Sequence, residues 1–113
     1  MDETKDGILP GTLEMLVLSA LRAGALHGYA IARRLEQSSG GEILVEEGSL
    51  YPALHRMERK GWIEAEWGLS EANRRAKYYR MTPAGKKRLA QEAAQWERVS
   101  GAIARVLAAP KGA

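Results

Sequence analysis

The stretch Gly48–Gly61, which reads GSLYPALHRMERKG, decides the fold of this chain. Leu50, Leu54 and Met57 recur within it at i, i+4 and i+7, so a helix through them carries a single apolar stripe. Such a stripe has to be buried against the rest of the protein. The spacing therefore predicts a helix over residues 49–60 that is anchored along one edge.

The residue types at both ends of this stretch also favour a helix. Ser49 is a favourable N-cap, because its hydroxyl can accept a hydrogen bond from a backbone N–H of the first turn. Pro52 then falls inside that first turn, where a missing N–H costs little. Gly61 follows the last turn, where a left-handed residue commonly ends a helix.

The remaining face of the predicted helix is polar and basic. It carries Ser49, Tyr51, His55, Arg56, Arg59 and Lys60. A helix that is held by one edge and presents such side chains outward is suited to a DNA groove. Basic residues on a surface helix can equally form a solvated face, and the helix alone does not decide between these interpretations.

Length and composition limit the classes of protein to which this chain can belong. The chain has 113 residues, 45% of them hydrophobic, and no cysteine. This size fits one domain, with or without an appended helix. The lack of cysteine excludes disulfides, zinc–thiolate sites and thiol catalysis, and two histidines alone disfavour any metal site. Without a catalytic motif or a phosphate-binding loop, we expect neither an enzyme nor a cofactor.

Nothing in the sequence predicts a membrane protein. The first residues include Asp2, Glu3 and Asp6, unlike the basic start of a signal peptide. No apolar run approaches the ~20 residues of a membrane span. We therefore expect no membrane partner and a cytoplasmic protein, associated with the nucleoid when it is bound to DNA.

Positive charge is concentrated in the middle of the chain. The formal net charge is only +3, but ten of the 17 basic residues lie between residues 48 and 88, together with four acidic ones. A basic block on a mildly acidic background is typical of a protein that binds a polyanion such as nucleic acid. An ordinary basic surface is the alternative.

Two shorter helices are predicted before this stretch. Apolar residues with helical spacing start near Thr12. A second helix follows the run LHGY at 26–29, in which we expect His27 to stabilise the turn, and it ends at SSGG, residues 38–41. Residues 43–45, Ile-Leu-Val, are β-prone and predict a minor strand.

After Gly61 the spacing of the apolar residues changes from the helical period of 3.6 residues to the strand period of 2 residues. Residues 62–67 and 76–81 alternate as strands do, and a polar segment with turn formers separates them, which predicts a hairpin over 62–81. Trp62 and Trp67 are assigned to packing within this hairpin. The basic residues at or beside its tip are Arg74, Arg75 and Lys77.

The longest helix is predicted at the end of the chain, over residues 83–108. Thr82 and Pro83 form a favourable start, as N-cap and first helical residue. Apolar and small residues then recur at steps of four and three, which makes a heptad-like seam. The seam consists of Leu89, Ala93, Trp96, Val99, Ser100, Ile103 and Leu107, with Val106 beside it.

A helix of this length cannot bury its whole seam against so small a domain. We expect a second copy of the same helix to cover it, which predicts a homodimer; packing back onto the first helix is the alternative. Trp96 is expected in the core of the dimer. In a second interpretation, Trp96 lines a cavity between the subunits and stacks on a small aromatic effector.

The order of these elements is that of a winged helix, in which a basic third helix is followed by a hairpin. The predicted class is mainly α with a small β-hairpin: a winged helix-turn-helix domain over 10–82 and a C-terminal dimerisation helix over 83–108. In this arrangement the basic residues of the hairpin lie beside the third helix, within reach of DNA phosphates.

Four motifs resemble those of the PadR family of transcriptional regulators. They are LHGY at 26–29, GSLYPAL at 48–54 with RME at 56–58, GWI at 61–63 and KYYRMTPAG at 77–85. The resemblance covers roughly residues 10–107. The single final helix resembles the compact branch of the family, and the wing sequence resembles an Acidobacterial-type subgroup.

The resemblance implies a homodimeric repressor that reads an inverted-repeat operator, with helix 49–60 in the major groove and hairpin 62–81 as the wing. It implies backbone contacts from Tyr51 and the Ser49 region, and it directs Arg56 and nearby residues towards the major groove. Phosphate contacts are implied for Arg74, Arg75 and Lys77. Some members of the family respond to planar aromatic effectors.

Three further expectations complete the prediction. His55 faces outward and either contacts DNA or is simply exposed. Glu58 is expected to pair with a basic residue of its own helix. A winged-helix module that binds protein instead of DNA remains as the rival function, although it would need no concentrated positive face.

Overall fold

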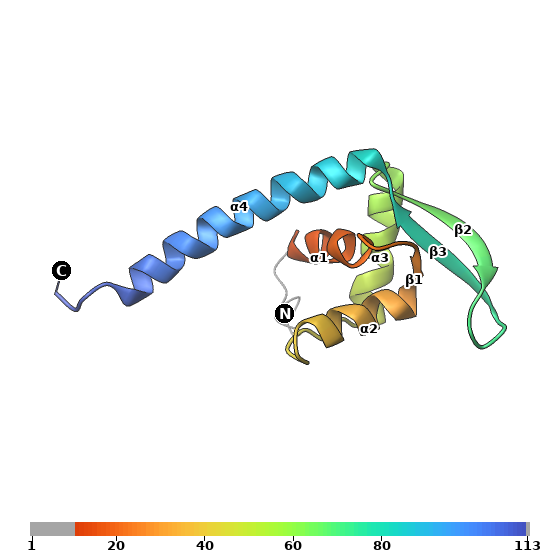
Figure 1. Cartoon of the computed structure of the whole chain (residues 1–113), viewed down its shortest axis with the longest axis horizontal. Helices are drawn as coiled ribbons and strands as arrows, with labels where there is room; N and C mark the ends of the chain where they lie inside the picture. The colour runs from red at the N-terminus through yellow and green to blue at the C-terminus, as the bar shows by residue number, and fades with distance from the viewer. Residues whose placement is uncertain (1–10, 113) are drawn as a thin grey trace.

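The computed structural model describes residues 11–112, and its four helices and its hairpin follow one another in the predicted order (Figure 1). The elements are α1 (Thr12–Ala20), β1 (Leu26–His27), α2 (Gly28–Ser38), α3 (Glu47–Arg59), β2 (Ile63–Leu69), β3 (Arg75–Met81) and α4 (Pro83–Ala108). The predicted class, a mainly α winged helix with a small hairpin, is confirmed. Figure 1 shows the hairpin and α4 extending in opposite directions from the three short helices, which gives a molecule of 60 × 27 × 26 Å.

The core lies between α1, α2, α3 and the base of the hairpin. Leu50, Leu54 and Met57 are at most 1% exposed, so the predicted stripe of α3 is confirmed. Val17 and Leu18 of α1, Ile31 and Leu35 of α2, Ala53 of α3 and Ile63 of β2 belong to the same cluster. This packing fixes the roll of α3 about its axis and therefore decides which of its side chains face outward.

The start of α3 differs from the prediction. The helix begins at Glu47, and its N-cap is Glu46, whose carbonyl accepts hydrogen bonds from the N–H groups of Ser49 and Leu50 at 3.0 and 2.9 Å. Ser49 is therefore inside the first turn and is not the N-cap. Pro52 consequently lies beyond the first turn, within the helix. The acidic Glu47 at this end is favourable because it faces the positive end of the helix dipole.

The end of α3 is as predicted. Gly61 has a φ of 79°, and its N–H donates to the carbonyl of Glu58 while the N–H of Trp62 donates to that of Met57. These two bonds form a Schellman motif, which turns the chain sharply from α3 into β2.

The sheet has three antiparallel strands in the order β1-β3-β2. The two-residue β1 was not predicted; Leu26 pairs with Tyr79 and His27 with Tyr78. The strand expected at residues 43–45 is absent, because this segment has no neighbouring strand to pair with and forms an irregular connection. Ile43 and Val45 instead pack against the core.

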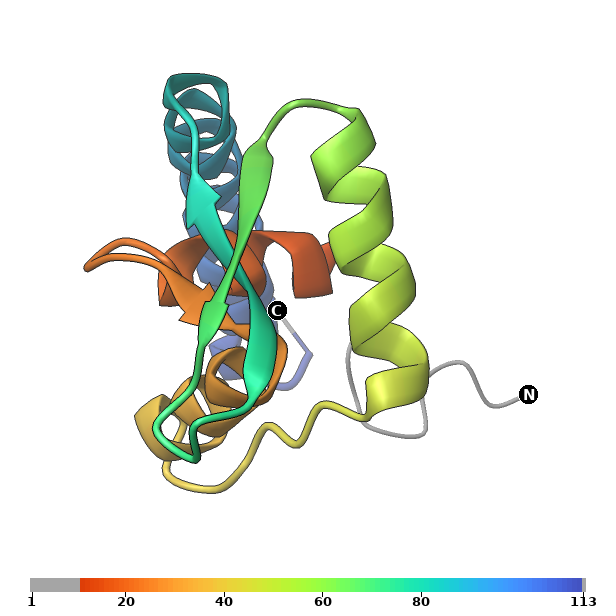
Figure 2. The ribbon, with the colours of Figure 1, turned by 90° about the vertical axis from the view of Figure 1, so that its right-hand side faces the viewer.

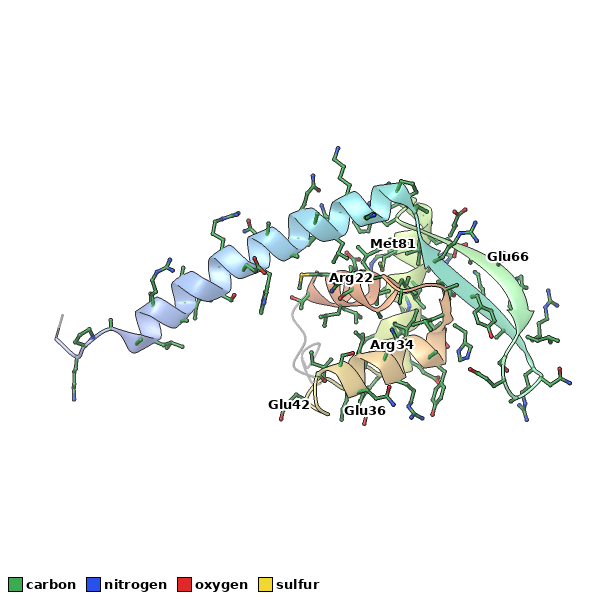
Figure 3. The ribbon with its side chains drawn as sticks, in the orientation of Figure 1. Arg22, Arg34, Glu36, Glu42, Glu66 and Met81 are labelled. Atoms are coloured by element: carbon green, nitrogen blue, oxygen red, sulfur yellow. The ribbon has the colours of Figure 1, made fainter. Side chains whose placement is uncertain are left out.

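The junction of the hairpin with α4 is tightly constrained. Thr82 is the N-cap as predicted: its Oγ1 accepts a hydrogen bond from the N–H of Gly85 at 3.0 Å and donates one to the carbonyl of Gly61 at 2.6 Å. A Cβ at Gly85 would overlap the carbonyl of Trp62 and press on Met81, which lies at the end of β3 beside this junction (Figure 3). The close approach fixes the direction in which α4 leaves the domain.

The first turns of α4 pack against α1, and the rest of the helix projects away from the domain (Figure 1). Leu89, the first residue of the predicted seam, is buried in the core of the domain. The alternative of packing onto the first helix thus holds for the start of α4 only. From Trp96 onward the apolar side chains of the seam are exposed.

Candidate nucleic-acid interface

The outer face of α3 is centred on His55 and Arg59. At about 100° per residue, these two side chains lie opposite the buried stripe, and both are exposed. Among residues 11–112, no hydrogen bond or ion pair engages the guanidinium of Arg59. Both side chains therefore point away from the part of the chain that the structure describes.

Arg56 occupies the flank of α3 that faces α1. Its Nε lies 3.4 Å from Oε2 of Glu14, a carboxylate that is itself largely buried. This contact orients the guanidinium towards α1, although about half of the Arg56 side chain remains exposed. Sequence spacing could not reveal the contact, because the two residues are 42 positions apart.

Glu58 lies on the opposite flank of α3, beside the wing, which is the name we use for β2, β3 and the loop between them. Its Oε1 is 3.3 Å from Nζ of Lys77, and both side chains are about one-third exposed. The prediction that Glu58 pairs within its own helix is therefore wrong. The fold brings the wing alongside α3 (Figure 2), so Lys77 of β3 reaches the carboxylate.

The wing has an inner face and an outer face of different character. Cross-strand pairs on the inner face are Ile63↔Met81, Ala65↔Tyr79, Trp67↔Lys77 and Leu69↔Arg75. On the outer face, Arg80 forms ion pairs with Glu64 and Glu66 at 3.3 and 3.6 Å. Glu66 lies on the long free part of the wing in Figure 3. The acidic residues of the strands thus lie on the outer face, and the inner face carries cations.

The loop at the wing tip is closed by hydrogen bonds around Ser70. Its N–H donates to the carbonyl of Arg74 and its carbonyl accepts from the N–H of Asn73, both at 2.8 Å. Asn73 has a φ of 60°, a left-handed conformation that asparagine tolerates better than most residues. Arg74 is therefore held at the tip with its side chain exposed.

A groove of about 670 Å³ runs between the wing, α3 and the start of α2. It brings together four of the predicted DNA-binding residues from two different elements: Tyr51, Arg74, Arg75 and Lys77. The other five, Ser49, His55, Arg56, Arg59 and Lys60, lie on or directly after α3 outside this groove. Lys60 is at the far end, where its Nζ lies 4.9 Å from the centre of the Trp62 ring.

Gly28 and His27 shape this groove, and spacing and residue type alone assign no role to Gly28. A Cβ at Gly28 would lie 2.5 Å from Oη of Tyr51, so only glycine allows the tyrosine to rest on the first turn of α2. His27 caps α2, since its Nδ1 accepts a hydrogen bond from the N–H of Ala30 at 3.2 Å. The expectation that His27 stabilises this turn is confirmed.

Tyr79 forms part of the floor of the groove and contributes no negative charge. Burial raises the pKa of its phenol, an effect that the nearby Lys77 partly opposes. The hydroxyl therefore stays protonated near neutral pH. Among the described residues there is no cluster of His, Asp or Glu that could hold a metal ion, and no helix is long and apolar enough to cross a membrane.

The exposed seam of α4 forms a second surface. Trp96 is 48% exposed, and Val99, Ile103, Val106 and Leu107 range from 40 to 80%. Ala93 and Ser100 of the predicted seam are half-buried. An apolar groove of about 330 Å³ follows this face from Arg98 to Leu107, and a depression of about 210 Å³ lies between α1 and α4, next to Trp96.

These features define a winged-helix protein whose third helix and wing form one basic surface. A family model described as the transcriptional regulator PadR-like family matches residues 17–91. The chain belongs to this family.

Solved structures of similar fold include other PadR proteins. A PadR family transcriptional regulator from Eggerthella lenta is 35% identical, with a TM-score of 0.74 over 88% of this chain and 85% of that one. A PadR-like regulator from Bacillus cereus is 29% identical, with a TM-score of 0.76 over 88% of this chain and 95% of that one. PadR of Bacillus subtilis, solved in complex with operator DNA, is 26% identical, with a TM-score of 0.64 over 72% of this chain and 46% of that one.

One relative is much longer than this chain. A 37.1 kDa protein of transposon TN4556 from Streptomyces fradiae is 43% identical over 90 residues, which is 80% of this chain and 24% of that protein. The chain thus spans about a quarter of the length of this relative.

Proposed function

We propose that this protein is a homodimeric, sequence-specific DNA-binding regulator, most simply a repressor, that acts in the cytoplasm on an inverted-repeat operator. The observation that carries the proposal is the single basic surface on which the outer face of α3 adjoins the groove containing Tyr51, Arg74, Arg75 and Lys77. Membership of the PadR-like family supports it, as does the operator complex of the Bacillus subtilis relative.

In this proposal α3 enters the major groove and the wing follows the neighbouring backbone. His55, Arg56 and Arg59 face base edges, where arginine is the commonest reader of guanine. Ser49 and Tyr51 contact the phosphate backbone at the start of the helix. Lys60 and the wing residues Arg74, Arg75 and Lys77 neutralise phosphates, which sets affinity and position but carries no sequence information.

The dimer is proposed from the exposed seam of α4. Monomeric proteins seldom leave a long run of large apolar side chains in water, and a second α4 would cover Trp96, Val99, Ile103 and Leu107. A two-fold axis through this contact would present two α3 helices to one side of a duplex. Half-sites about 34 Å apart, in successive major grooves, would then form an inverted repeat.

The direct test is selection of duplexes from a random pool by the purified protein, followed by binding titrations on the selected and on scrambled sequences. We expect an inverted repeat to be enriched and to bind far more tightly than the scrambled duplex. Equal affinity for both duplexes would contradict the proposal and favour a winged-helix module that binds protein.

A second proposal concerns an effector. The depression between α1 and α4 is lined by Trp96, Val99, Met15, Thr12 and Glu92, among others. An indole face suits stacking on a flat aromatic molecule. We propose that such a molecule binds there and releases the operator. Quenching of tryptophan fluorescence by members of an aromatic panel, lost in Trp96→Leu, is expected; quenching that persists in this variant would contradict the proposed site.

A further inference from the structure

Trp67 is far more exposed than its assignment to hairpin packing predicts. Its side chain is 56% exposed, whereas Ile63, four residues earlier on the same face of β2, is buried. The inner face of the wing extends beyond the core, and there the side chains of Trp67 and Leu69 are exposed to solvent. A large indole in water is unfavourable by the hydrophobic effect, so its position calls for a partner.

The surroundings of Trp67 indicate what that partner is. The indole lies in the groove that also contains Tyr51, and its cross-strand neighbour is Lys77. The guanidinium carbon of Arg75 is 4.5 Å from the centre of the ring, in a cation–π contact. The carboxylates of the strands are on the outer face, paired with Arg80.

An aromatic ring flanked by cations matches the chemistry of a nucleic-acid strand, which offers apolar sugar and base faces between phosphates. A protein partner with an apolar patch would gain nothing from the cations around the ring. Charge and continuity with the surface of α3 therefore both favour DNA as the occupant.

We propose that Trp67 contacts DNA directly, with its indole against the deoxyriboses of the minor groove or wedged against a base at an opened step, while Arg74 and Arg75 hold the flanking phosphates. This inference rests on the proposed DNA-binding function. It adds to the interface a tryptophan, which a search for clustered Lys and Arg residues would miss. Arg75, stacked on the ring, orients the indole and keeps a positive charge beside it.

Two variants with one tryptophan each provide the test. W62F/W96F retains only Trp67, and W67F/W96F retains only Trp62, which is half-buried between Lys60 and Arg88 outside the groove. Acrylamide quenching is measured with and without a duplex selected from a random pool by the wild-type protein. We expect DNA to shield Trp67 strongly from acrylamide and to shield Trp62, which reaches the interface only through Lys60, much less.

Affinity measurements complete the experiment. Removal of a stacked aromatic residue costs about 5- to 150-fold in binding, so we expect Trp67→Ala to lose affinity in this range and Trp67→Phe to retain most of it. Because the indole meets no phosphate, the dependence of affinity on salt should not change in Trp67→Ala. Circular dichroism of each variant verifies that the wing and helices are intact.

The outcomes separate the inference from the proposal on which it rests. If the wild type binds DNA but Trp67 stays fully open to acrylamide and Trp67→Ala binds normally, the inference is wrong and the DNA-binding function stands. If the wild type binds no duplex, both are wrong.

Discussion

At the scale of single residues, the interface depends on contacts between side chains that are distant in sequence. Tyr51 lies against Gly28, Arg56 against Glu14 and Glu58 against Lys77. The composition of α3 shows that these side chains are polar, but not which of them are held by neighbours. Within residues 11–112, His55 and Arg59 on its outer face are exposed and have no hydrogen-bond or ion-pair partner.

Gly28→Ala is expected to weaken DNA binding without lowering the stability of the fold. The added methyl group would lie 2.5 Å from the hydroxyl oxygen of Tyr51 and would displace the ring, while α2 itself tolerates alanine at its first residue. We expect a melting temperature close to that of the wild type and a loss of affinity for the operator as large as that of Tyr51→Ala. In the Tyr51→Ala background, Gly28→Ala should have no further effect on affinity; additive losses would contradict this role of the glycine.

Arg56→Ala tests base reading. If its guanidinium leaves Glu14 for a guanine, the substitution should cost about 1–3 kcal/mol on the selected duplex and much less on a scrambled one. Titrations on both duplexes measure the difference. Equal losses on the two duplexes would assign Arg56 to the backbone or to the packing of α1 against α3.

At the scale of elements, sequence periodicity predicted the features that depend only on the type and spacing of nearby residues. The stripe of α3, the two long strands and the capped start of α4 at Thr82 all follow from spacing and residue type. The short β1, the start of α3 at Glu47 and the exposure of Trp67 do not. Each of these depends on which segment becomes a neighbour, and alternation alone cannot show where the core ends beneath a strand.

Gly85→Ala probes the junction between the wing and α4. A methyl group at this position overlaps the carbonyl of Trp62, and overpacking of this kind costs typically about 1–3 kcal/mol. We expect a lower free energy of unfolding by thermal or denaturant melting. Gly101→Ala is the matched control in the same helix: its Cβ would have no neighbour nearer than 3.8 Å, so it should be neutral or stabilising.

At the scale of the whole molecule, the two halves of α4 have different surroundings. The start of α4, including Leu89, is part of the domain core, whereas the apolar side chains from Trp96 onward are exposed. The sequence predicted the seam but not where it changes from core to surface, because a heptad pattern is the same whichever partner covers it.

Ile103→Glu tests the proposed dimer. A carboxylate in the middle of the seam would have to be buried in the contact, which is strongly unfavourable. We expect a monomer in sedimentation or light-scattering measurements and weak binding to the inverted repeat. Ala94→Glu, at an exposed position on the opposite side of α4, should remain dimeric. A dimeric Ile103→Glu would contradict an interface through this seam.

If α3 and the wing together form a DNA-binding surface, the affinity for the operator must fall steeply as the salt concentration rises. Each phosphate contact that is lost reduces the slope of log K against log salt by about 0.9. The wild type should show a steep slope, and the double variant Arg74→Ala/Arg75→Ala should show one shallower by about two, with similar losses on selected and scrambled duplexes. A slope near zero in the wild type, or an unchanged slope in the double variant, would contradict the account.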